Sequence, residues 1–340
     1  MKDIPLISII LVEHYYYSKK FLDSLKSYFD QNYKNLEFVI VFWGKGENPN
    51  NFKIKLREIS KSEVNVSIIE LRGDPGYAKG NNLGVKYANG EYIMITNPDV
   101  IVPKDFITHI LKSYFYLKKL LKTDKIILGP RICNYGTNYE HSRRIINFLG
   151  FSNIDISKTN KIRRTQITSG CNFLIRKKDF LNLNGFDSSY FMYHEDADFS
   201  IRAEMQDFKQ YVDNSIELYH LRAPKNIKLT KFKYYYHERN RIIMTIEHSK
   251  RKNKMIISHL MFEPIHLFYA FIKGFLFERF KIYKYIIHNY AKLMNTSNKE
   301  NRLFDNDYDL SGIFYEINSK GLLLKILNFY SKMIFYLYHN

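Results

Sequence analysis

Short apolar runs and helical periodicities alternate along the first 130 residues of the chain. The first of these runs, residues 7–12, is nearly continuous, which is typical of a strand that is buried on both faces of a sheet. A regular succession of strand and helix predicts an α/β fold, with a mostly parallel sheet flanked by helices. In such a sheet, ligands bind where the strands end at their carboxyl edge. The predicted strands are residues 7–12, 36–42, 64–71 and 92–95, and the predicted helices include 51–60 and 104–122.

The third predicted strand is followed by a glycine-rich turn that runs from Gly73 to Gly84 and opens a helix. Glycines permit a close approach of the backbone, and the amides at a helix N-terminus attract phosphate. The spacing matches neither the Walker loop nor the dinucleotide-binding G-x-G-x-x-G pattern. The turn fits a nucleotide contact, and it also fits a strand–helix connection whose glycines serve only the backbone.

The fourth predicted strand ends in Ile95-Thr96-Asn97-Pro98-Asp99, which places a carboxylate at the carboxyl edge of the sheet. A single acid at such a position can hold a divalent cation that bridges phosphate oxygens. The alternative is an Asp that belongs to a proline-containing turn. Asp99 is therefore a candidate metal ligand.

A cluster of carboxylates follows the tripeptide Gly185-Phe186-Asp187: Glu195, Asp196 and Asp198 lie within four residues. Carboxylates this close repel one another, so the cluster indicates either a function or the capping of a helix. In the first case, one of them is a general base that accepts the proton of a hydroxyl nucleophile. In the second, Asp196 caps the following helix while Phe199 faces the core.

Taken together and in this order, these segments resemble the family 2 glycosyltransferases of the GT-A fold, over about residues 5–250, and within them the rhamnosyltransferase-like group. The resemblance implies transfer of a sugar, with inversion, from a nucleotide diphosphate donor, with Mg²⁺ or Mn²⁺ as cofactor. This group often extends glycans on lipid carriers. The motifs that carry the resemblance are Asn81-Asn82-x-Gly84, Asn97-Pro98-Asp99, Gly185-Phe186-Asp187, Glu195-Asp196-x-Asp198 and Arg202, with further agreement at Gly170, Arg176, Tyr219-His220 and Arg239-Asn240-Arg241.

The family pattern assigns roles to individual residues of this chain. Asp99 matches the metal-binding acid, and Asp196 matches the catalytic base. Glu195 would help to position the acceptor, and His220 would lie near the diphosphate as a second metal ligand, although a lone His beside a strand is more often structural. The expected donor-binding residues are Glu13, Trp43, Gly76, Lys79, Asn81, Asn82 and Asn97, and the expected acceptor or sugar contacts are Gly170 and Asp198.

One feature departs from the family pattern. The family usually has an Asp after the second strand that hydrogen-bonds the nucleotide base, whereas this chain continues from Val41 through Phe42-Trp43-Gly44-Lys45. Glu13 could take over base recognition, or Trp43 could stack on the base. Trp43 as a core aromatic at a strand end is the alternative. Because of this departure, the sequence does not predict which nucleotide the protein binds. The departure also supports a second hypothesis, a catalytically silent relative that binds a nucleotide sugar or a glycan.

The charge of the chain is uneven. The formal net charge is +18, and residues 221–340 hold 21 basic against 9 acidic side chains, or +12 of that excess. An anionic partner is expected there. Nucleic acid is disfavoured, because the aromatic residues follow core-like and amphipathic spacings rather than a stacking groove. We therefore expect two domains, residues 1–250 with the GT-A fold and residues 251–340 as a helical, basic and aromatic extension.

The extension is expected to hold the protein on a membrane surface. Apolar residues of 322–338 share one helical face, and Lys325, Asn328, Ser331 and Lys332 share the other, which is the pattern of an in-plane helix. The most apolar stretch, 255–277, is interrupted by polar residues, so no spanning segment is predicted. The chain opens without a secretory signal and has two cysteines. These features predict a reducing, cytoplasmic setting, on the cytoplasmic face of a membrane, with packing in a homo-oligomer as the alternative for the helices.

Overall fold

The computed structural model describes residues 4–14, 18–43, 49–60, 65–135, 140–141, 143–155, 160–221, 229–295 and 322–339. The chain divides into two compact units. The first unit comprises residues 1–143, 156–191 and 195–227, and the second comprises residues 144–155, 192–194 and 228–340. Helix α7 (Lys231–Glu247) therefore groups with the C-terminal helices, which differs from the expected division at residue 250. The predicted pair of domains, 1–250 and 251–340, stays a prediction.

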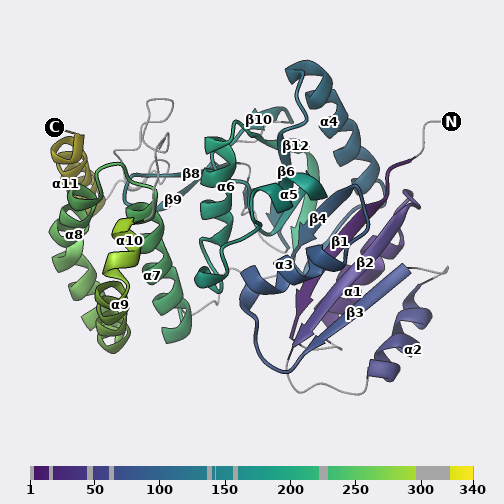
Figure 1. The fold of residues 1–340 in the computed structure, drawn as a ribbon, viewed down its shortest axis with the longest axis horizontal. Coiled ribbons are helices and arrows are strands. Elements are labelled where there is room, and N and C mark those ends of the chain that lie inside the picture. The colour runs from purple at the N-terminus through teal and green to yellow at the C-terminus, as the bar shows by residue number, and fades with distance from the viewer. Residues whose placement is uncertain are drawn as a thin grey trace. The chain divides into compact units, whose positions relative to one another are not determined.

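The first unit is built around a mixed, mostly parallel sheet (Figure 1). Strands β3, β2, β1 and β4 are parallel, and so are β6 and β12, whereas β11 runs antiparallel between β4 and β6. The strand order is β10-β12-β6-β11-β4-β1-β2-β3, with β5 on β12 and β7 on β6. The predicted fold class is confirmed. The strands are β1 (Ile7–Glu13), β2 (Leu36–Trp43), β3 (Asn65–Leu71), β4 (Tyr92–Thr96), β5 (Val100–Ile101), β6 (Ile126–Asn134), β7 (Glu140–His141), β10 (Ile162–Arg164), β11 (Asn172–Arg176) and β12 (Lys209–His220).

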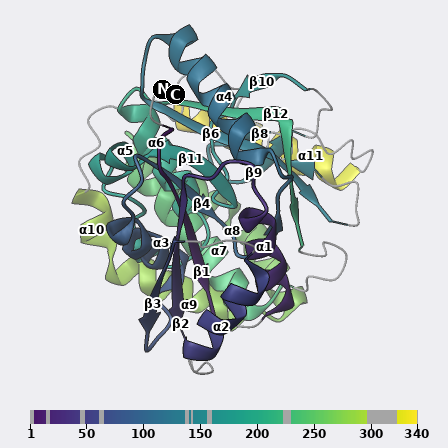
Figure 2. The ribbon, with the colours of Figure 1, turned by 90° about the vertical axis from the view of Figure 1, so that its right-hand side faces the viewer.

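Helices cover both faces of this sheet (Figures 1 and 2). On β1, Ile9 and Leu11 pack into the apolar cluster on one face, and Ile10 packs into the cluster on the other. This double burial is why the strand is apolar without alternation. The first face carries α1 (Lys19–Phe29), α2 (Pro49–Ile59) and α4 (Phe106–Leu121), and the second carries α3 (Gly76–Tyr87), α5 (Lys177–Asn182) and α6 (Glu195–Met205), with the short 3₁₀ helix η1 at Ser188–Tyr190.

Helix α3 lies unusually close to the sheet, and glycine makes this possible. A Cβ atom at Gly84 would lie 2.6 Å from Cγ2 of Ile10, a separation that real side chains do not reach. Gly84 therefore serves the packing of α3 on the sheet. This agrees with the alternative interpretation of the turn, in which the glycines serve the backbone and not a nucleotide.

In the part of the second unit that the structure describes, the helices are accompanied by a two-stranded sheet of β8 (Arg143–Ile146) and β9 (Ser152–Asp155). The sequence pattern does not predict strands β7, β8, β9 and β10, which lie between residues 140 and 164. These strands are short and polar, so they lack the apolar runs by which the other strands are recognised. The helices of the second unit are α7, α8 (Lys252–Lys273), α9 (Leu276–His288), α10 (Tyr290–Asn295) and α11 (Leu322–His339), which confirms the C-terminal helical extension.

A buried ion network joins α7, α8 and α9. The guanidinium of Arg279 pairs with Glu263 and, at 2.9 Å, with Glu238, and Glu238 also pairs with Arg241 at 2.8 Å. Burial alone would raise the pKa of Glu238, but Arg241, His266 and Arg279 hold it well below its ordinary value. Two buried arginines and two carboxylates thus neutralise one another inside the helical unit.

Helix α8 is long and apolar enough, by length and composition, to cross a membrane. His259, Pro264 and His266 interrupt the apolar run without adding a formal charge, and the expectation that no segment spans a bilayer stays a prediction. Core helices of soluble proteins reach the same length and composition. The side chains of residues 322–328 of the predicted in-plane helix, with Lys325 and Asn328 among them, lie outside the described part of the structure.

Candidate active site

The ends of β1 and β2 bring together the two residues expected to recognise a nucleotide base. The strands are parallel and in register, with Glu13 opposite Phe42, so Glu13 and Trp43 lie at the same edge of the sheet. The ring of His14 stacks on Trp43, with ring centroids 4.0 Å apart and planes inclined by 27°. The backbone N–H of His14 donates to Oε1 of Glu13 at 2.7 Å. Trp43 is half-buried rather than part of the core, and His14 joins it as a partner that the sequence motifs did not single out.

The ends of β4 and β12 bring the candidate metal ligands together. His220 pairs with Val100 in the β5–β12 ladder, which places its imidazole beside the turn after β4. Nε2 of His220 lies 3.0 Å from Oδ1 of Asp99 and 3.5 Å from Nδ2 of Asn97. The side chains of Asp99 and His220 are 27% and 11% exposed, so the pair can be reached from solvent.

The Asp99–His220 pair fits a cation that is completed by its substrate. In the described ranges, no group of three or more His, Cys, Asp or Glu side chains converges to hold a metal ion. Mg²⁺ commonly uses one or two protein carboxylates and takes its other ligands from substrate phosphates and water. A carboxylate oxygen and an imidazole nitrogen that already face each other provide such an incomplete ligand set.

Asp196 lies in the first turn of α6, where the backbone of the turn before β11 holds its carboxylate. Its Oδ2 atom accepts a hydrogen bond from the N–H of Gly170 at 2.9 Å. The hydroxyl of Tyr77 donates to the carbonyl of the same Gly170. Burial, assisted by the charges of Glu195 and Asp196, raises the pKa of Tyr77 well above its ordinary value, so the phenol stays a donor. Asp196 is 9% exposed, and the bond to Gly170 fixes the carboxylate that the family pattern assigns as the base.

The segment that holds Asp196 also contacts the turn that carries the metal ligands. The backbone N–H of Asn97 donates to the carbonyl of Cys171 at 2.8 Å, and Cys171 follows Gly170 directly. Hydrogen bonds therefore connect Asp196 through Gly170 and Cys171 to Asn97 and its neighbours. The structure brings five of the expected residues into one site: Asn97, Asp99, Gly170, Asp196 and His220.

Asp198 has a structural partner instead of an open position. Its carboxylate forms an ion pair with Arg202 at 2.8 Å, and its side chain is 5% exposed. Arg202 in turn donates to the carbonyls of Leu183 and Gly185, the latter at 2.7 Å. The pair thus ties α6 to the turn before Phe186. This geometry indicates a positioning role, and the predicted contact of Asp198 with acceptor or sugar stays a prediction.

Asn82 and Asn81 are likewise engaged inside the protein. Oδ1 of Asn82 accepts from the backbone N–H of Phe186 at 2.8 Å, and Nδ2 of Asn82 donates to the Phe186 carbonyl at 2.6 Å. Asn81 has no exposed surface, and its Nδ2 donates to the Tyr77 carbonyl at 2.9 Å. These contacts explain the asparagine pair by packing, and its predicted donor contacts remain untested.

The N-terminus of α3 is closed by protein groups. The N–H of Gly76 donates to Oδ1 of Asp74 at 2.8 Å, and the N–H of Ala78 donates to the Phe191 carbonyl at 3.1 Å. Gly76 has φ +68°, and a Cβ atom there would lie 2.5 Å from the same carbonyl oxygen, so only glycine fits. Two amides that the sequence offered to a phosphate are therefore already satisfied.

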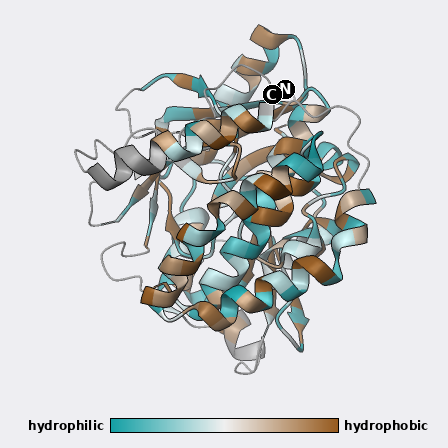
Figure 3. Cartoon of the chain, turned by 90° about the vertical axis from the view of Figure 1, so that its left-hand side faces the viewer, coloured by the Kyte–Doolittle hydropathy of each residue, from teal (hydrophilic) through white to brown (hydrophobic). Residues whose placement is uncertain are grey.

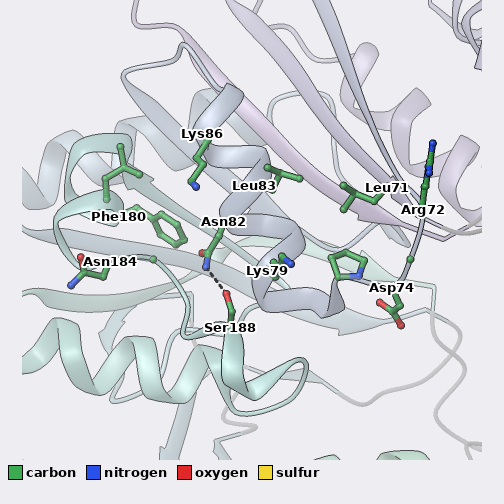
Figure 4. Close-up of a pocket in the computed structure, with 14 residues that line it drawn as sticks. Leu71, Arg72, Asp74, Lys79, Asn82, Leu83, Lys86, Phe180, Asn184 and Ser188 are labelled. Atoms are coloured by element: carbon green, nitrogen blue, oxygen red, sulfur yellow. Dashed lines mark hydrogen bonds between the residues drawn. The ribbon is translucent and has the colours of Figure 1, made fainter. Parts of the chain in front are cut away.

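Lys79 borders a cavity of about 880 Å³ on the side of α3 away from the sheet (Figure 4). Lys79 and Lys86 are both exposed, and Asn82 lies between them along the helix. The cavity walls come from the β3–α3 turn, from α3, and from the α5–η1 region. Lys79 is thus an exposed cation beside the turn for which the sequence predicts a donor contact.

A strained segment precedes the carboxylates of α6. Phe191, Tyr193 and His194 all have positive φ, between 63° and 67°, a conformation that is uncommon for bulky residues and that concentrates at functional sites. In the second unit, Nδ2 of Asn240 donates to the carbonyls of Met192 and Tyr193 at 2.8 and 2.7 Å. The sequence motifs contain Asn240 without indicating this contact.

The profile of glycosyl transferase family 2 matches residues 9–197, which is more than half of the chain and includes β1, the Asp99 turn and Asp196. The chain belongs to glycosyl transferase family 2. The rhamnosyltransferase WbbL of Escherichia coli K12 is 29% identical over 219 residues, which cover 59% of this chain and 77% of WbbL. The low-salt glycan biosynthesis hexosyltransferase Agl10 of Haloferax volcanii is 24% identical over 209 residues, covering 59% of this chain and 62% of Agl10.

Solved structures support the fold of this family 2 glycosyltransferase. GalNAc-T7, crystallised with UDP, GalNAc and Mn²⁺, superposes with a TM-score of 0.60 at 13% identity, over 88% of this chain and 60% of that one. The mannosyltransferase PcManGT of Pyrobaculum calidifontis, in complex with GDP-Man and Mn²⁺, gives a TM-score of 0.53 at 14% identity, over 87% and 84%. These superpositions show the GT-A fold that the resemblance implied, and the family match shows a glycosyltransferase.

Proposed function

We propose that the protein transfers a hexosyl-type sugar, with inversion at the anomeric carbon, from a nucleotide diphosphate to a hydroxyl of a glycan or lipid-linked acceptor. Asp196 takes the proton of the acceptor hydroxyl as its oxygen bonds to the anomeric carbon. The bond from that carbon to the diphosphate breaks, and the electron pair leaves with the diphosphate. The observation that carries the proposal is Asp196, fixed by Gly170 and connected by hydrogen bonds to the Asp99 turn.

Asp99 and His220 are the residues that would hold Mg²⁺ or Mn²⁺. When bound, the cation would neutralise the charge that develops on the leaving diphosphate. Support comes from the convergence of the two side chains at 3.0 Å and from the Mn²⁺ in the two superposed enzymes. Asn97, which contacts His220, would orient the imidazole toward this position.

The nucleotide base would lie against the edge formed by β1 and β2. The stacked pair of His14 and Trp43 offers an aromatic surface, and Glu13 offers a carboxylate for a base N–H group. Stacking tolerates different bases, and each stacked base gains ~1–3 kcal/mol. We propose that this edge replaces the Asp that the family usually has, with Lys79 as a flexible cation toward the diphosphate and Glu195 as an aid to acceptor positioning.

The acceptor is proposed from the relatives. WbbL is named a rhamnosyltransferase, and Agl10 is named a hexosyltransferase of glycan biosynthesis. These names and the family resemblance both fit a growing glycan as acceptor, either free or carried on a lipid. The site geometry adds the requirement of a hydroxyl nucleophile for Asp196.

The proposal is tested with a panel of nucleotide sugars, scored first for thermal stabilisation and then for transfer. A ligand that binds only the folded protein at one hundred times its Kd stabilises it by ~2.7 kcal/mol. We expect one donor to stabilise the protein strongly, and only with Mg²⁺ or Mn²⁺ present. A catalytically silent relative would bind that donor without consuming it, whichever acceptor is tested. The proposal would be contradicted if none of the nucleotide sugars stabilised the protein.

A further inference from the structure

Helix α8 turns an apolar side away from the protein. Its protein-facing side contains Met255, His259 and Phe262, all buried. The opposite side of a helix on a soluble protein is normally polar. Here large apolar residues are exposed on one side of the helix: Ile257, Leu260, Phe268, Phe271 and Ile272, each 55–69% exposed.

Helix α9 extends this apolar side and adds charge of one sign. Phe277, Phe280 and Ile287 are 58–75% exposed. Between residues 252 and 295 the exposed charges are all basic: Lys273, Lys281, Lys284 and Lys292. Figure 3 shows hydrophobic and hydrophilic residues interleaved along these helices on one face of the second unit.

The acidic residues of the two helices do not reach this face. Glu263 is held by Arg279 in the buried ion network, and Glu278 is 6% exposed. The outward sides of α8 and α9, which we term the α8–α9 surface, therefore combine aromatic and aliphatic side chains with lysines alone. An anionic bilayer is the partner that matches both properties, because apolar side chains enter the interface while lysines contact the headgroups.

The contacts of α8 favour an in-plane position over a span. Nε2 of His259 and Oγ1 of Thr245 share a hydrogen bond at 2.7 Å, and Glu263 pairs with Arg279. One side of α8 therefore packs against α7 and α9 through polar contacts. A spanning helix would carry these polar groups into hydrocarbon. We propose that the α8–α9 surface lies on the surface of an anionic lipid bilayer, with α8 and α9 parallel to the membrane plane.

The test is sedimentation of the full chain with vesicles of phosphatidylcholine, with or without phosphatidylserine, at low and high salt. We expect binding to the anionic vesicles that weakens with salt. A lysine near an anionic leaflet strengthens binding about fivefold, so Lys273→Glu with Lys281→Glu and Lys284→Glu should weaken it at least 100-fold. Phe268→Ser with Phe271→Ser should also weaken binding, and this loss should persist at high salt.

Matched controls use exposed residues of the first unit. Lys112→Glu with Lys119→Glu and Lys178→Glu changes the net charge by the same amount, and Tyr116→Ser with Leu120→Ser removes exposed apolar surface from α4. Both controls should bind vesicles as the unmodified chain does. Nucleotide-sugar stabilisation, measured for every variant, verifies folding and reports on the proposed function separately from membrane binding.

Three results would overturn the proposal. The first is a full chain that fails to sediment with anionic vesicles at low salt. The second is normal vesicle binding by the α8–α9 variants, together with a difference in lipid-free solution, where the unmodified chain is a dimer and the variants are monomers. That result would make this surface an interface between copies. The third is retention on membranes through alkaline carbonate extraction, which would show that α8 spans the bilayer.

Discussion

Asn82→Ala should destabilise the protein, because Asn82 clamps the backbone of Phe186. The substitution removes both hydrogen bonds to Phe186, at 2.8 and 2.6 Å. Each such bond contributes about 0.5–1.5 kcal/mol, and a buried N–H without a partner costs a similar 1–3 kcal/mol. Phe186 is 1% exposed, inside the aromatic cluster with Phe180 and Phe199, so water entering from the cavity beside Asn82 replaces the lost partner only in part. We therefore expect a loss of about 2–3 kcal/mol in the free energy of unfolding.

The assay is urea denaturation together with nucleotide-sugar affinity. Lys86→Ala, an exposed change on the same helix, is the control and should alter the unfolding free energy by less than about 0.5 kcal/mol. If Asn82→Ala left stability unchanged and weakened donor binding instead, the clamp would be refuted and the donor-binding role expected from the sequence would stand.

Three further outcomes are expected. Asp99→Ala should abolish the Mg²⁺- or Mn²⁺-dependent part of donor binding, measured by calorimetry, and equal metal dependence in the variant would refute the ligand assignment. Arg279→Met should cost about 3–5 kcal/mol in chemical denaturation, since it leaves Glu238 and Glu263 short of a buried partner; a cost below about 1 kcal/mol would contradict the network. Burial lowers the pKa of His259, and that of His266 to about 3, so both stay neutral in the folded protein. The contribution of each neutral histidine to the free energy of unfolding is complete above the unfolded-state pKa near 6.5. Below that pKa, the free energy of unfolding falls by about 1.4 kcal/mol per pH unit for each residue. Denaturation at pH 7.5 and 5.5 measures this loss, and equal stability at the two values would contradict it.

Three of the predicted strands, β1, β2 and β4, are mostly apolar and are buried along nearly their whole length, whereas β3 is only partly buried. The predicted bounds of all four differ by about one residue from the observed ones. Strand β6 was not recognised, because Gly129, Pro130 and Arg131 interrupt its apolar character although every residue in it is buried. Its position between β11 and β12 depends on pairing across the sheet, which a local pattern does not contain.

The residues of the site could be named from motifs, but their partners could not. His220 reaches Asp99 over 121 positions, and Asn82 reaches Phe186 over 104 positions, so no spacing rule links either pair. The glycine-rich turn showed where α3 begins, yet only the structure shows that Phe191 closes its N-terminus. Local physics predicts which side chains are unusual, and the topology decides whether a ligand or the protein itself uses them.

Transfer by Asp196→Asn tests the central claim most directly. Asn has the same shape but cannot take the acceptor proton, so kcat should fall by about 10²–10⁴-fold while donor affinity with metal stays nearly unchanged. Asp23→Asn, an exposed carboxylate on α1, serves as the matched control and should transfer at the normal rate. Normal turnover by Asp196→Asn would contradict the account and would leave Glu195 as the next carboxylate to examine.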